Sequence, residues 1–391
     1  MAFGRSRTDA TERHRRRSLP GDLGGAFGDL GTLLPYALGA ATIGGLSAVG
    51  VFGGFAVFLI ATGLFYGIPI AVQPMKAVGA VVMTGGLSPA EVLTAGVAIG
   101  GTMLVLGASG LAVRLARLVP QSVTTGLQLG LGLAMISIGL TLMAGMPWLA
   151  AASVAFLMAA LRWPRVPSAA VLVVGAVTWG ILFPQGEATT TASQVWGMPP
   201  LPSPAEIWSA MTLAVLPQLA LTLTNAVILT AALSRDLFGV RAHRANERNL
   251  SLTTGIFNLL LAPFGALPMC HGAGGLQAQW RFGARSGLAP VALGVGILVL
   301  LVVFGAQIVT AVAAMPMAVL GALLAFAGAD LATSKRLFDA RPRCWPTIAV
   351  AAALTLFLDA AWGLAGGILT EKLTDTLVRL RRDRAAGRTG L

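Results

Sequence analysis

The sequence predicts an all-α polytopic membrane protein, and three observations support this class. Of 391 residues, 56% are hydrophobic and only 11% are charged, whereas soluble domains contain about 25% charged residues. The apolar residues form long blocks, such as 90–113, 167–183 and 288–312, each close to the roughly 20 residues that a helix needs to cross a bilayer. Basic residues separate these blocks in an alternating pattern.

Breaks at glycine, proline and charged residues divide the apolar blocks into about fourteen expected transmembrane segments. In chain order they are 22–46, 48–66, 69–86, 90–112, 119–143, 146–161, 166–183, 206–233, 248–264, 268–284, 288–312, 315–331, 344–359 and 361–379.

Basic residues follow every even-numbered segment, and the connections after odd-numbered segments contain none. The longest of these uncharged or acidic connections, between residues 183 and 207, has only Glu187 and Glu206. Because cytoplasmic loops carry an excess of Lys and Arg, both termini are expected on the cytoplasmic side of the cell (inner) membrane. The basic clusters are Arg114 and Arg117, Arg162 and Arg165, Arg235 to Arg248, Arg281 and Arg285, Lys335 to Arg343, and Arg379 to Arg388.

The N-terminal stretch 1–20 is basic and lacks the apolar core and cleavage site of a signal peptide, so we expect a cytoplasmic tail and no nucleic-acid binding. Cys270 and Cys344 offer neither a disulfide framework nor metal-ligand spacing. Neither a metal nor a cofactor is predicted.

Two stretches half the chain apart are similar. "GIPIAVQPMKAVGAV" from Gly67 and "GALPMCHGAGGLQAQ" from Gly265 each contain a glycine, a proline and then a polar residue, Gln73 or His271. Pro69 and Pro268 lie 199 residues apart, in segments three and ten, which enter the membrane from opposite sides. An inverted repeat of two seven-segment halves, 21–185 and 206–380, is the simplest explanation. Residues 186–205 then form an extracytoplasmic loop, and 381–391 a cytoplasmic tail.

In both stretches we expect a short extended piece followed by a half-helix. Pro74 suits the first turn of a helix, and it makes the preceding Gln73 extended; the second half-helix is expected to start near Gly272. Irregular backbone at membrane depth requires protein or a wet cavity around it. Two half-helix N-termini present free N–H groups and partial positive charge, and glycine allows close approach to them. The pattern therefore predicts an anion site built from backbone.

Plainer interpretations exist for the same residues. Glycine-rich runs in membrane helices more often permit close helix packing. His271 alone is more often a satisfied core histidine, and Cys270 is a small apolar filler. Lys76, the single basic residue deep within a segment, could pair with Asp29 or lose its proton, because an uncompensated charge there is costly.

Four stretches carry a resemblance to a known family: "FGDLGTLLPYALGA" (27–40), "YGIPIAVQPMKAVGA" (66–80), "LPQLALTLTNAVILTAALSRDLF" (216–238) and "LPMCHGAGGLQAQWRFGARSG" (267–287). They resemble the molybdate transporters of the sulfate permease superfamily. The resemblance implies fourteen helices, a core domain of segments 1–4 and 8–11, and a gate domain of segments 5–7 and 12–14. It implies an oxyanion between segments three and ten, and no C-terminal regulatory domain. Residues 90–200 match only in hydropathy, so no gate contacts are carried over.

The candidate site residues come from four segments. Gln218, Thr222 and Asn225 have the i, i+4, i+7 spacing of one helical face without an acid, and Asp29 is a candidate for carrying a coupling proton. The expected substrate-binding residues are Thr32, Gln73, Pro74, Met75, Lys76, Gln218, Thr222, Asn225, Cys270, His271, Gly272, Ala273, Gly274 and Gly275.

These observations predict a secondary-active transporter of a tetrahedral oxyanion by alternating access, with molybdate preferred and sulfate the closest alternative. Bicarbonate and a nucleobase are alternative substrates, and an uncoupled anion channel is an alternative mechanism. Saturable flux that depends on a proton gradient distinguishes a carrier from a channel. No metal motif, paired carboxylates or nucleophile elbow favours an enzyme. The expected partners are the anion and the lipid bilayer, and a homodimer is left open.

Overall fold

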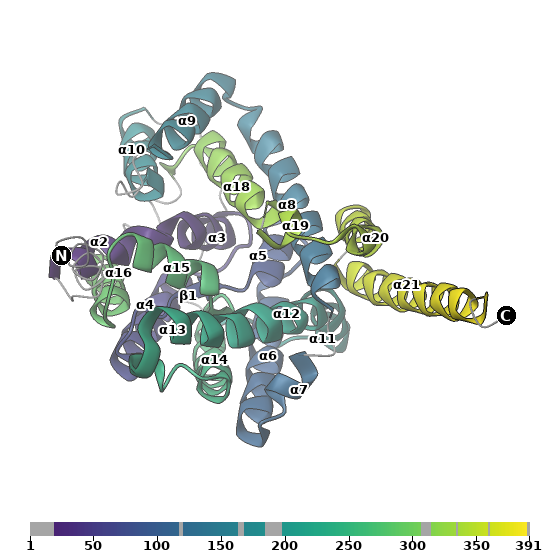
Figure 1. The fold of residues 1–391 in the computed structure, drawn as a ribbon. Coiled ribbons are helices and arrows are strands. Elements are labelled where there is room, and N and C mark those ends of the chain that lie inside the picture. The colour runs from purple at the N-terminus through teal and green to yellow at the C-terminus, as the bar shows by residue number, and fades with distance from the viewer. Residues whose placement is uncertain are drawn as a thin grey trace, which may run out of the picture.

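The computed structural model describes residues 19–116, 120–162, 168–183, 198–305, 314–333, 335–358 and 360–388. Its helices pack in two groups, which we call the central bundle and the flanking bundle (Figure 1). The flanking bundle contains α8, α9, α10, α18, η6, α20 and α21, and all other helices and both strands except the short α19 belong to the central bundle. Helices α3, α5, α12 and the π-helix η2 contact the flanking bundle, so the interface between the bundles runs along these elements.

The central bundle is built from both halves of the chain. Its elements are α2 (Leu19–Ala26), η1 (Phe27–Asp29), α3 (Leu30–Thr42), α4 (Ala48–Tyr66), β1 (Val72–Pro74), α5 (Lys76–Met83), α6 (Pro89–Ser109), α7 (Ala112–Ala116), α11 (Pro204–Ala210), η2 (Met211–Val215), α12 (Leu216–Leu221), η3 (Thr222–Leu229), α13 (Thr230–Phe238), η4 (Gly239–Ala242), α14 (Glu247–Leu261), η5 (Ala262–Phe264), β2 (Met269–His271), α15 (Ala273–Arg281) and α16 (Leu288–Phe304).

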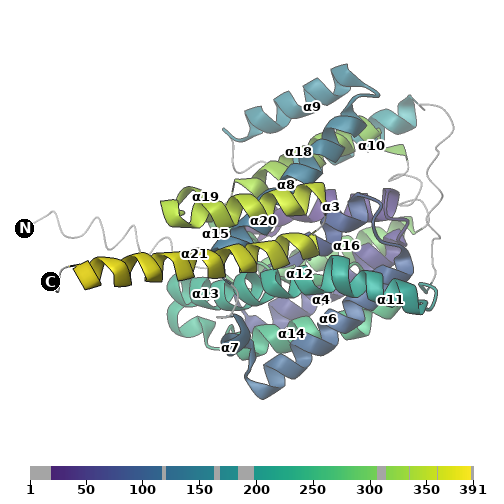
Figure 2. The same ribbon diagram turned by 90° about the vertical axis from the view of Figure 1, so that its right-hand side faces the viewer.

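Among the described residues, the flanking bundle likewise contains helices from both halves of the chain. Its elements are α8 (Gln121–Met143), α9 (Pro147–Ala160), α10 (Ser168–Leu182), α18 (Met317–Ala332), α20 (Trp345–Phe357) and α21 (Ala360–Arg388), with α19 (Lys335–Phe338) and η6 (Pro342–Cys344) between α18 and α20. Helix α21 runs beside α20 and extends beyond the rest of the molecule (Figure 2). It continues past residue 379, where the apolar segment was expected to end.

The helices have the length and composition of membrane spans. Among the described residues, four continuous helices are long and apolar enough to cross a bilayer: Ala48–Tyr66, Pro89–Ser109, Gln121–Met143 and Pro204–Ala242. Pro147–Ala160, Ser168–Leu182, Leu288–Phe304 and Met317–Ala332 are shorter apolar helices. Large apolar side chains such as Leu64 and Val302 point outward, at 70% and 77% exposed. Helices that are apolar all round are typical of membrane proteins.

The two similar stretches cross at the centre of the molecule. Helix α4 ends at Gly67 (φ 64°) and η5 ends at Gly265 (φ 80°), both left-handed, a conformation that favours glycine. The chain then continues extended into β1 and β2, which pair antiparallel with Gln73 opposite Cys270. Each strand is followed by a short helix, α5 or α15. The expected extended stretch plus helix is therefore confirmed at both places.

Protein groups satisfy the backbone of this irregular crossing. The Asn258 side chain bonds both polar groups of Met269: Oδ1 accepts from the Met269 N–H (2.8 Å) and Nδ2 donates to its carbonyl (2.6 Å). Directly after β1, the Met75 N–H donates to the carbonyl of Pro268, the residue before β2 (2.9 Å). Buried backbone without water needs such partners, so the crossing is a fixed feature of the fold.

Segment eight is one continuous helix with two π-helical stretches, Met211–Val215 and Thr222–Leu229. It begins with a capping box at Ser203 and Glu206, and α6 begins with the same "SPAE" motif and capping box at Ser88 and Glu91. Ser88 Oγ also donates to Glu206 Oε1 (3.0 Å), so the two helix starts lie side by side.

Candidate anion-binding site

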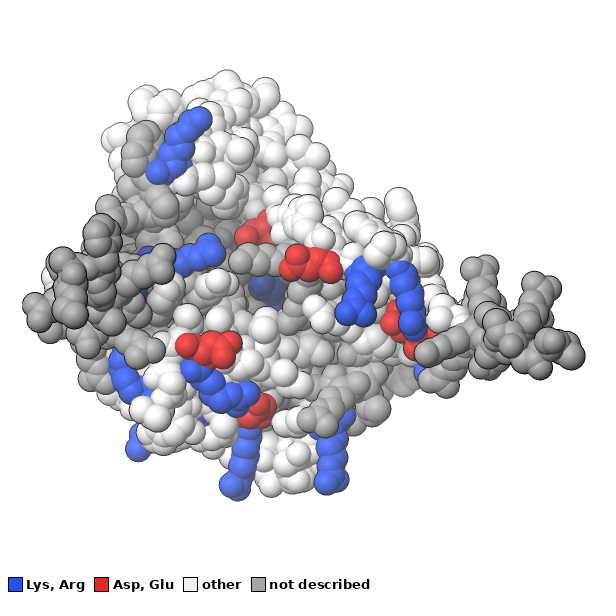
Figure 3. All heavy atoms as spheres, in the orientation of Figure 1, with Lys and Arg blue, Asp and Glu red and all other residues white. Residues whose placement is uncertain are grey.

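A cavity of about 320 Å³ opens between the two bundles beside the strand crossing. On the face of the molecule in Figure 3, a few blue and red groups lie at a recess near the centre, and the other charged side chains are spread over the lower edge, the right and the upper left. The cavity is lined from η1, α3, β1, the start of α5, the length of α15, and α18. Its lining residues are Gly28, Asp29, Gly31, Thr32, Tyr36, Gln73, Lys76, Gly274, Gln277, Ala278, Arg281, Phe326, Ala327, Asp330 and Leu331.

The starts of α5 and α15 both contribute to this cavity. Lys76 is the first residue of α5, and Gly274 is the second residue of α15. Strands β1 and β2 hold the two helix starts together, because they are paired immediately before them. Helix N-termini carry partial positive charge and unsatisfied N–H groups, and Lys76 adds a full positive charge. The arrangement suits an anion.

Lys76 makes no ion pair within 4.0 Å with any carboxylate of the described residues; the two pairs found there are Arg235–Glu247 and Arg343–Asp375. Asp29, the expected partner, instead accepts a hydrogen bond at Oδ1 from Gln73 Nε2 (2.6 Å). Asp29 is 4% exposed, and its Oδ2 is buried with no hydrogen-bond partner among the described residues. Among the described residues, Lys76 therefore lines the cavity without a carboxylate within ion-pair distance.

Five of the predicted site residues line the cavity together: Asp29, Thr32, Gln73, Lys76 and Gly274. Pro74 and Met75 lie in the strand and cap that lead into α5 and are not part of the cavity wall. Ala273 is buried at the first position of α15, also away from the wall. Pro74, Met75 and Ala273 therefore shape the backbone next to the cavity, and their side chains do not line it.

The predicted polar residues of segment eight, Gln218, Thr222 and Asn225, lie outside the cavity wall. Gln218 Oε1 accepts from the Ala77 N–H in the first turn of α5 (2.8 Å), and Gln218 Nε2 donates to Thr222 Oγ1 (2.9 Å). Asn225 lies within the π-helical stretch, whose wider turn alters the α-helical spacing that would place it over Thr222. None of the three lines the cavity. Gln218 and Thr222 position α5.

His271 and Cys270 point into packed protein. His271 is fully buried, its Nε2 shares a hydrogen bond with Thr253 Oγ1 (2.7 Å), and its ring packs edge-on against Phe58 and Tyr66. Cys270 is a buried free cysteine in the paired strand. Both positions match the plainer interpretations, a satisfied core histidine and a small filler.

The three glycines of the "CHGAGG" run differ in their surroundings. A Cβ at Gly272 would collide with the Gln73 side chain, and a Cβ at Gly275 would collide with the Asp29 carboxylate and Ala71. A Cβ at Gly274 would meet nothing within 4 Å. Gly272 and Gly275 therefore permit close packing, and only Gly274 leaves open space beside the cavity.

Comparisons with known proteins identify the family of the chain. A family model described as "Molybdate transporter of MFS superfamily" matches residues 21–135 and 210–331. The chain belongs to the molybdate transporter family. It is 31% identical to "Molybdate transporter 2" of Arabidopsis thaliana over 415 residues, covering 90% of this chain and 87% of the relative. It is also 31% identical to "Molybdate transporter 1" of the same plant, covering 90% and 88%.

Solved structures show the same fold in distant proteins. The transmembrane domain of the cyanobacterial bicarbonate transporter BicA superposes with a TM-score of 0.65 at 19% identity, covering 89% of this chain and 98% of that one. The structure of SLC26A9 superposes with a TM-score of 0.67 at 16% identity, covering 92% and 65%. This member of the molybdate transporter family is thus a multi-pass membrane transporter and not an enzyme.

Sequence reasoning missed several cavity residues of this transporter. Gln277 and Arg281 of α15 follow Gly274 at i+3 and i+7, the spacing of one helical face, and this signal could have identified them. Tyr36 similarly follows Thr32 at i+4. Asp330 lies in the last turn of an otherwise apolar helix from the flanking bundle. Nothing in its local sequence pairs it with residues some 250–300 positions earlier.

Proposed function

We propose that this protein carries a tetrahedral oxyanion, preferably molybdate, across the cell membrane by alternating access. The observation that supports the proposal most directly is the cavity at the starts of α5 and α15, with Lys76 unpaired beside open backbone at Gly274. The names of the relatives identify molybdate among the candidate anions.

In this proposal the central bundle is the core domain and the flanking bundle is the gate domain, arranged as a fourteen-segment inverted repeat with both termini cytoplasmic. The position of the cavity between the two bundles supports it, because relative movement of the bundles would expose such a cavity to either side in turn. The pairing of β1 with β2, one from each half, fits a pseudo-symmetric core.

Asp29 is the proposed coupling residue. Its carboxyl group is buried at the cavity, contacts Gln73, and has one oxygen without a partner among the described residues. A buried carboxylate without a positive partner is costly, so taking up a proton when the anion binds would stabilise this group. The rate of uptake is then expected to rise with an inward proton gradient.

The test is a titration of the purified protein with molybdate and with sulfate, followed by uptake into proteoliposomes. We expect saturable molybdate binding that is tighter than sulfate binding, and saturable uptake stimulated by an inward proton gradient. Tighter binding of sulfate would reassign the substrate. Flux that rises linearly with molybdate concentration would indicate a channel and contradict the carrier.

A further inference from the structure

Arg281 is one of the two basic residues that line the cavity, the other being Lys76. It is the last residue of α15 and is exposed. It forms no ion pair within 4.0 Å with any carboxylate of the described residues, although Asp330 lines the same cavity from α18. Within the described part of the chain, ion pairing therefore does not neutralise the charge of Arg281.

One face of α15 follows the cavity from the helix start to Arg281. Gly274, Gln277 and Arg281 have the i, i+3, i+7 spacing of one helical face, and all three line the cavity. At a rise of about 1.5 Å per residue, Gly274 and Arg281 are roughly 10 Å apart along the helix axis. Helical side chains lean toward the N-terminus, so the long side chain of Arg281 is expected to extend back toward the start of α15, where the anion is proposed to bind.

We infer that Arg281 provides the second positive charge for a bound dianion and thereby sets the preference of the site for dianions over monoanions. This inference rests on the proposed function and deepens it by assigning anion selectivity to one residue. Because Coulomb attraction scales with the product of the charges, a dianion gains about twice as much from Arg281 as a monoanion in the same place. The planar guanidinium can also donate two parallel hydrogen bonds to an oxyanion.

No group changes its protonation in this inference, so it is separate from the proton uptake proposed for Asp29. A plainer role for Arg281 is stabilisation of the end of α15. A basic residue in the last turn of a helix interacts favourably with the partial negative charge there, and Arg281 occupies such a position. That role affects the stability of the protein and gives no preference between a dianion and a monoanion.

The test compares the binding of molybdate and of perrhenate, a tetrahedral monoanion, to the full-length protein at one fixed pH, in the parent and in Arg281→Gln. The substitution removes the charge and keeps a polar side chain. We expect the molybdate affinity to fall on the order of tenfold, the lower end for hydrogen bonds to a charged group, because solvent screens an exposed charge. The perrhenate affinity should fall by a smaller factor, so the ratio of the two affinities shifts toward perrhenate.

Three further variants isolate the charge at this position. Arg281→Lys keeps the charge and should keep a molybdate-to-perrhenate ratio close to that of the parent. Arg248→Gln removes an exposed arginine of α14 that does not line the cavity, and it should leave both affinities unchanged. Thermal unfolding without anion shows whether each variant is folded. If Arg281→Gln is not, Arg281→Met removes the same charge while keeping a long, unbranched side chain.

Unchanged molybdate affinity in Arg281→Gln would overturn the inference, and so would equal losses for molybdate and perrhenate. A lower unfolding temperature without a change in either affinity would assign Arg281 to the helix end alone. Failure of the parent to bind either molybdate or sulfate would instead refute the proposed function, so the two failures are distinguishable.

Discussion

At the scale of single residues, a substitution at Gly274 distinguishes a role in helix packing from a role in anion binding. Because a Cβ there meets nothing within 4 Å, Gly274→Val should fold but place bulk beside the cavity. We expect its thermal unfolding to remain close to the parent and its molybdate binding to be lost. Gly101→Val in α6 is the matched control, since a Cβ there also meets nothing within 4 Å and Gly101 does not line the cavity. Parent-like affinity of Gly274→Val would show that this glycine does not border the anion.

Lys76 provides a second test at the same scale. It forms no ion pair with the other described residues, so Lys76→Gln should leave the anion-free protein as stable as the parent or more stable. Charge-assisted hydrogen bonds contribute about 1.5–3 kcal/mol, so its molybdate affinity should fall by roughly ten- to a hundredfold. Binding titrations and thermal unfolding measure the two effects. Destabilisation by Lys76→Gln that Asp29→Asn reverses would instead indicate that the two residues pair.

Single residues also show why part of the site could be predicted and part could not. Gln73, Lys76 and Gly274 follow local rules about proline, glycine and helix starts, so the sequence alone predicted that they lie at the starts of two short helices. Asp22 was not singled out, yet its carboxylate accepts from the Arg285 and Ser286 N–H groups at 2.6 and 2.9 Å. The "RFGARSG" stretch is therefore in part structural, a contact over 263 residues that no local pattern contains.

At the scale of elements, apolar blocks divided at glycine, proline and charged residues predicted a chain made mostly of apolar helices, but they did not predict deviations inside those helices. The π-helical stretches of segment eight have the composition of ordinary apolar helix, and they alter the face on which Asn225 lies. Asn258 was missed in the same way. It lies among apolar residues in the last two turns of α14, and its role depends on the backbone of Met269 in the next element.

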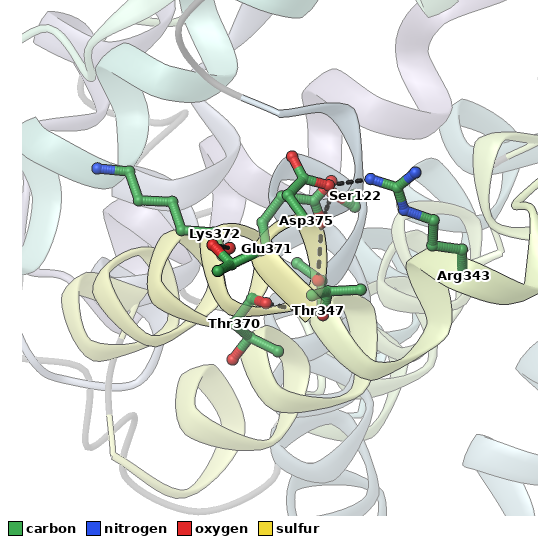
Figure 4. Close-up of polar contacts among 9 residues, drawn as sticks. Ser122, Arg343, Thr347, Thr370, Glu371, Lys372 and Asp375 are labelled. Carbon is green, nitrogen blue, oxygen red and sulfur yellow. Dashed lines mark hydrogen bonds and ion pairs between the residues drawn. The ribbon is translucent and has the colours of Figure 1, made fainter. Parts of the chain in front are cut away.

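Glu371 connects three helices of the flanking bundle. Its Oε2 accepts from Ser122 Oγ of α8 (2.9 Å) and from Thr347 Oγ1 of α20 (2.7 Å), as Figure 4 shows. Glu371→Ala removes both bonds and leaves the buried Thr347 hydroxyl unsatisfied. We expect the free energy of unfolding to fall by about 1.5–3 kcal/mol, the range for hydrogen bonds to a charged group. Thermal and denaturant unfolding measure this change.

The controls for Glu371 lie on the same helix. Glu371→Gln keeps an oxygen that can accept both hydroxyls and should lose less stability than Glu371→Ala. Lys372→Ala alters an exposed neighbour whose side chain points away from the network in Figure 4 and should be neutral. Molybdate affinity should be unchanged in all three, because neither residue lines the cavity. Equal stability of Glu371→Ala and the parent would show that the three helices are held by apolar packing alone.

At the scale of the whole molecule, the pattern of basic residues predicts the orientation in the membrane. Two positions with equal exposure test it: Leu201 before α11 and Val240 in η4, both 91% exposed. Leu201 belongs to the long connection with acidic residues only, and Val240 lies within the cluster from Arg235 to Arg248. Positive loops remain in the cytoplasm, so a cysteine at Leu201 should react with an impermeant reagent added to whole cells, and a cysteine at Val240 only after permeabilisation.

Because the two positions are equally exposed, a cysteine that fails to react must lie on the other side of the membrane, and burial does not explain the difference. The background protein should carry Cys344→Ser, since Cys344 is half-buried, whereas Cys270 is buried and can remain. The reverse labelling pattern would contradict cytoplasmic termini. Labelling of both positions from outside would be more damaging, because an odd number of crossings separates them in the fourteen-segment arrangement. The two halves could then not be inverted copies, and the pairing of β1 with β2 would need another origin.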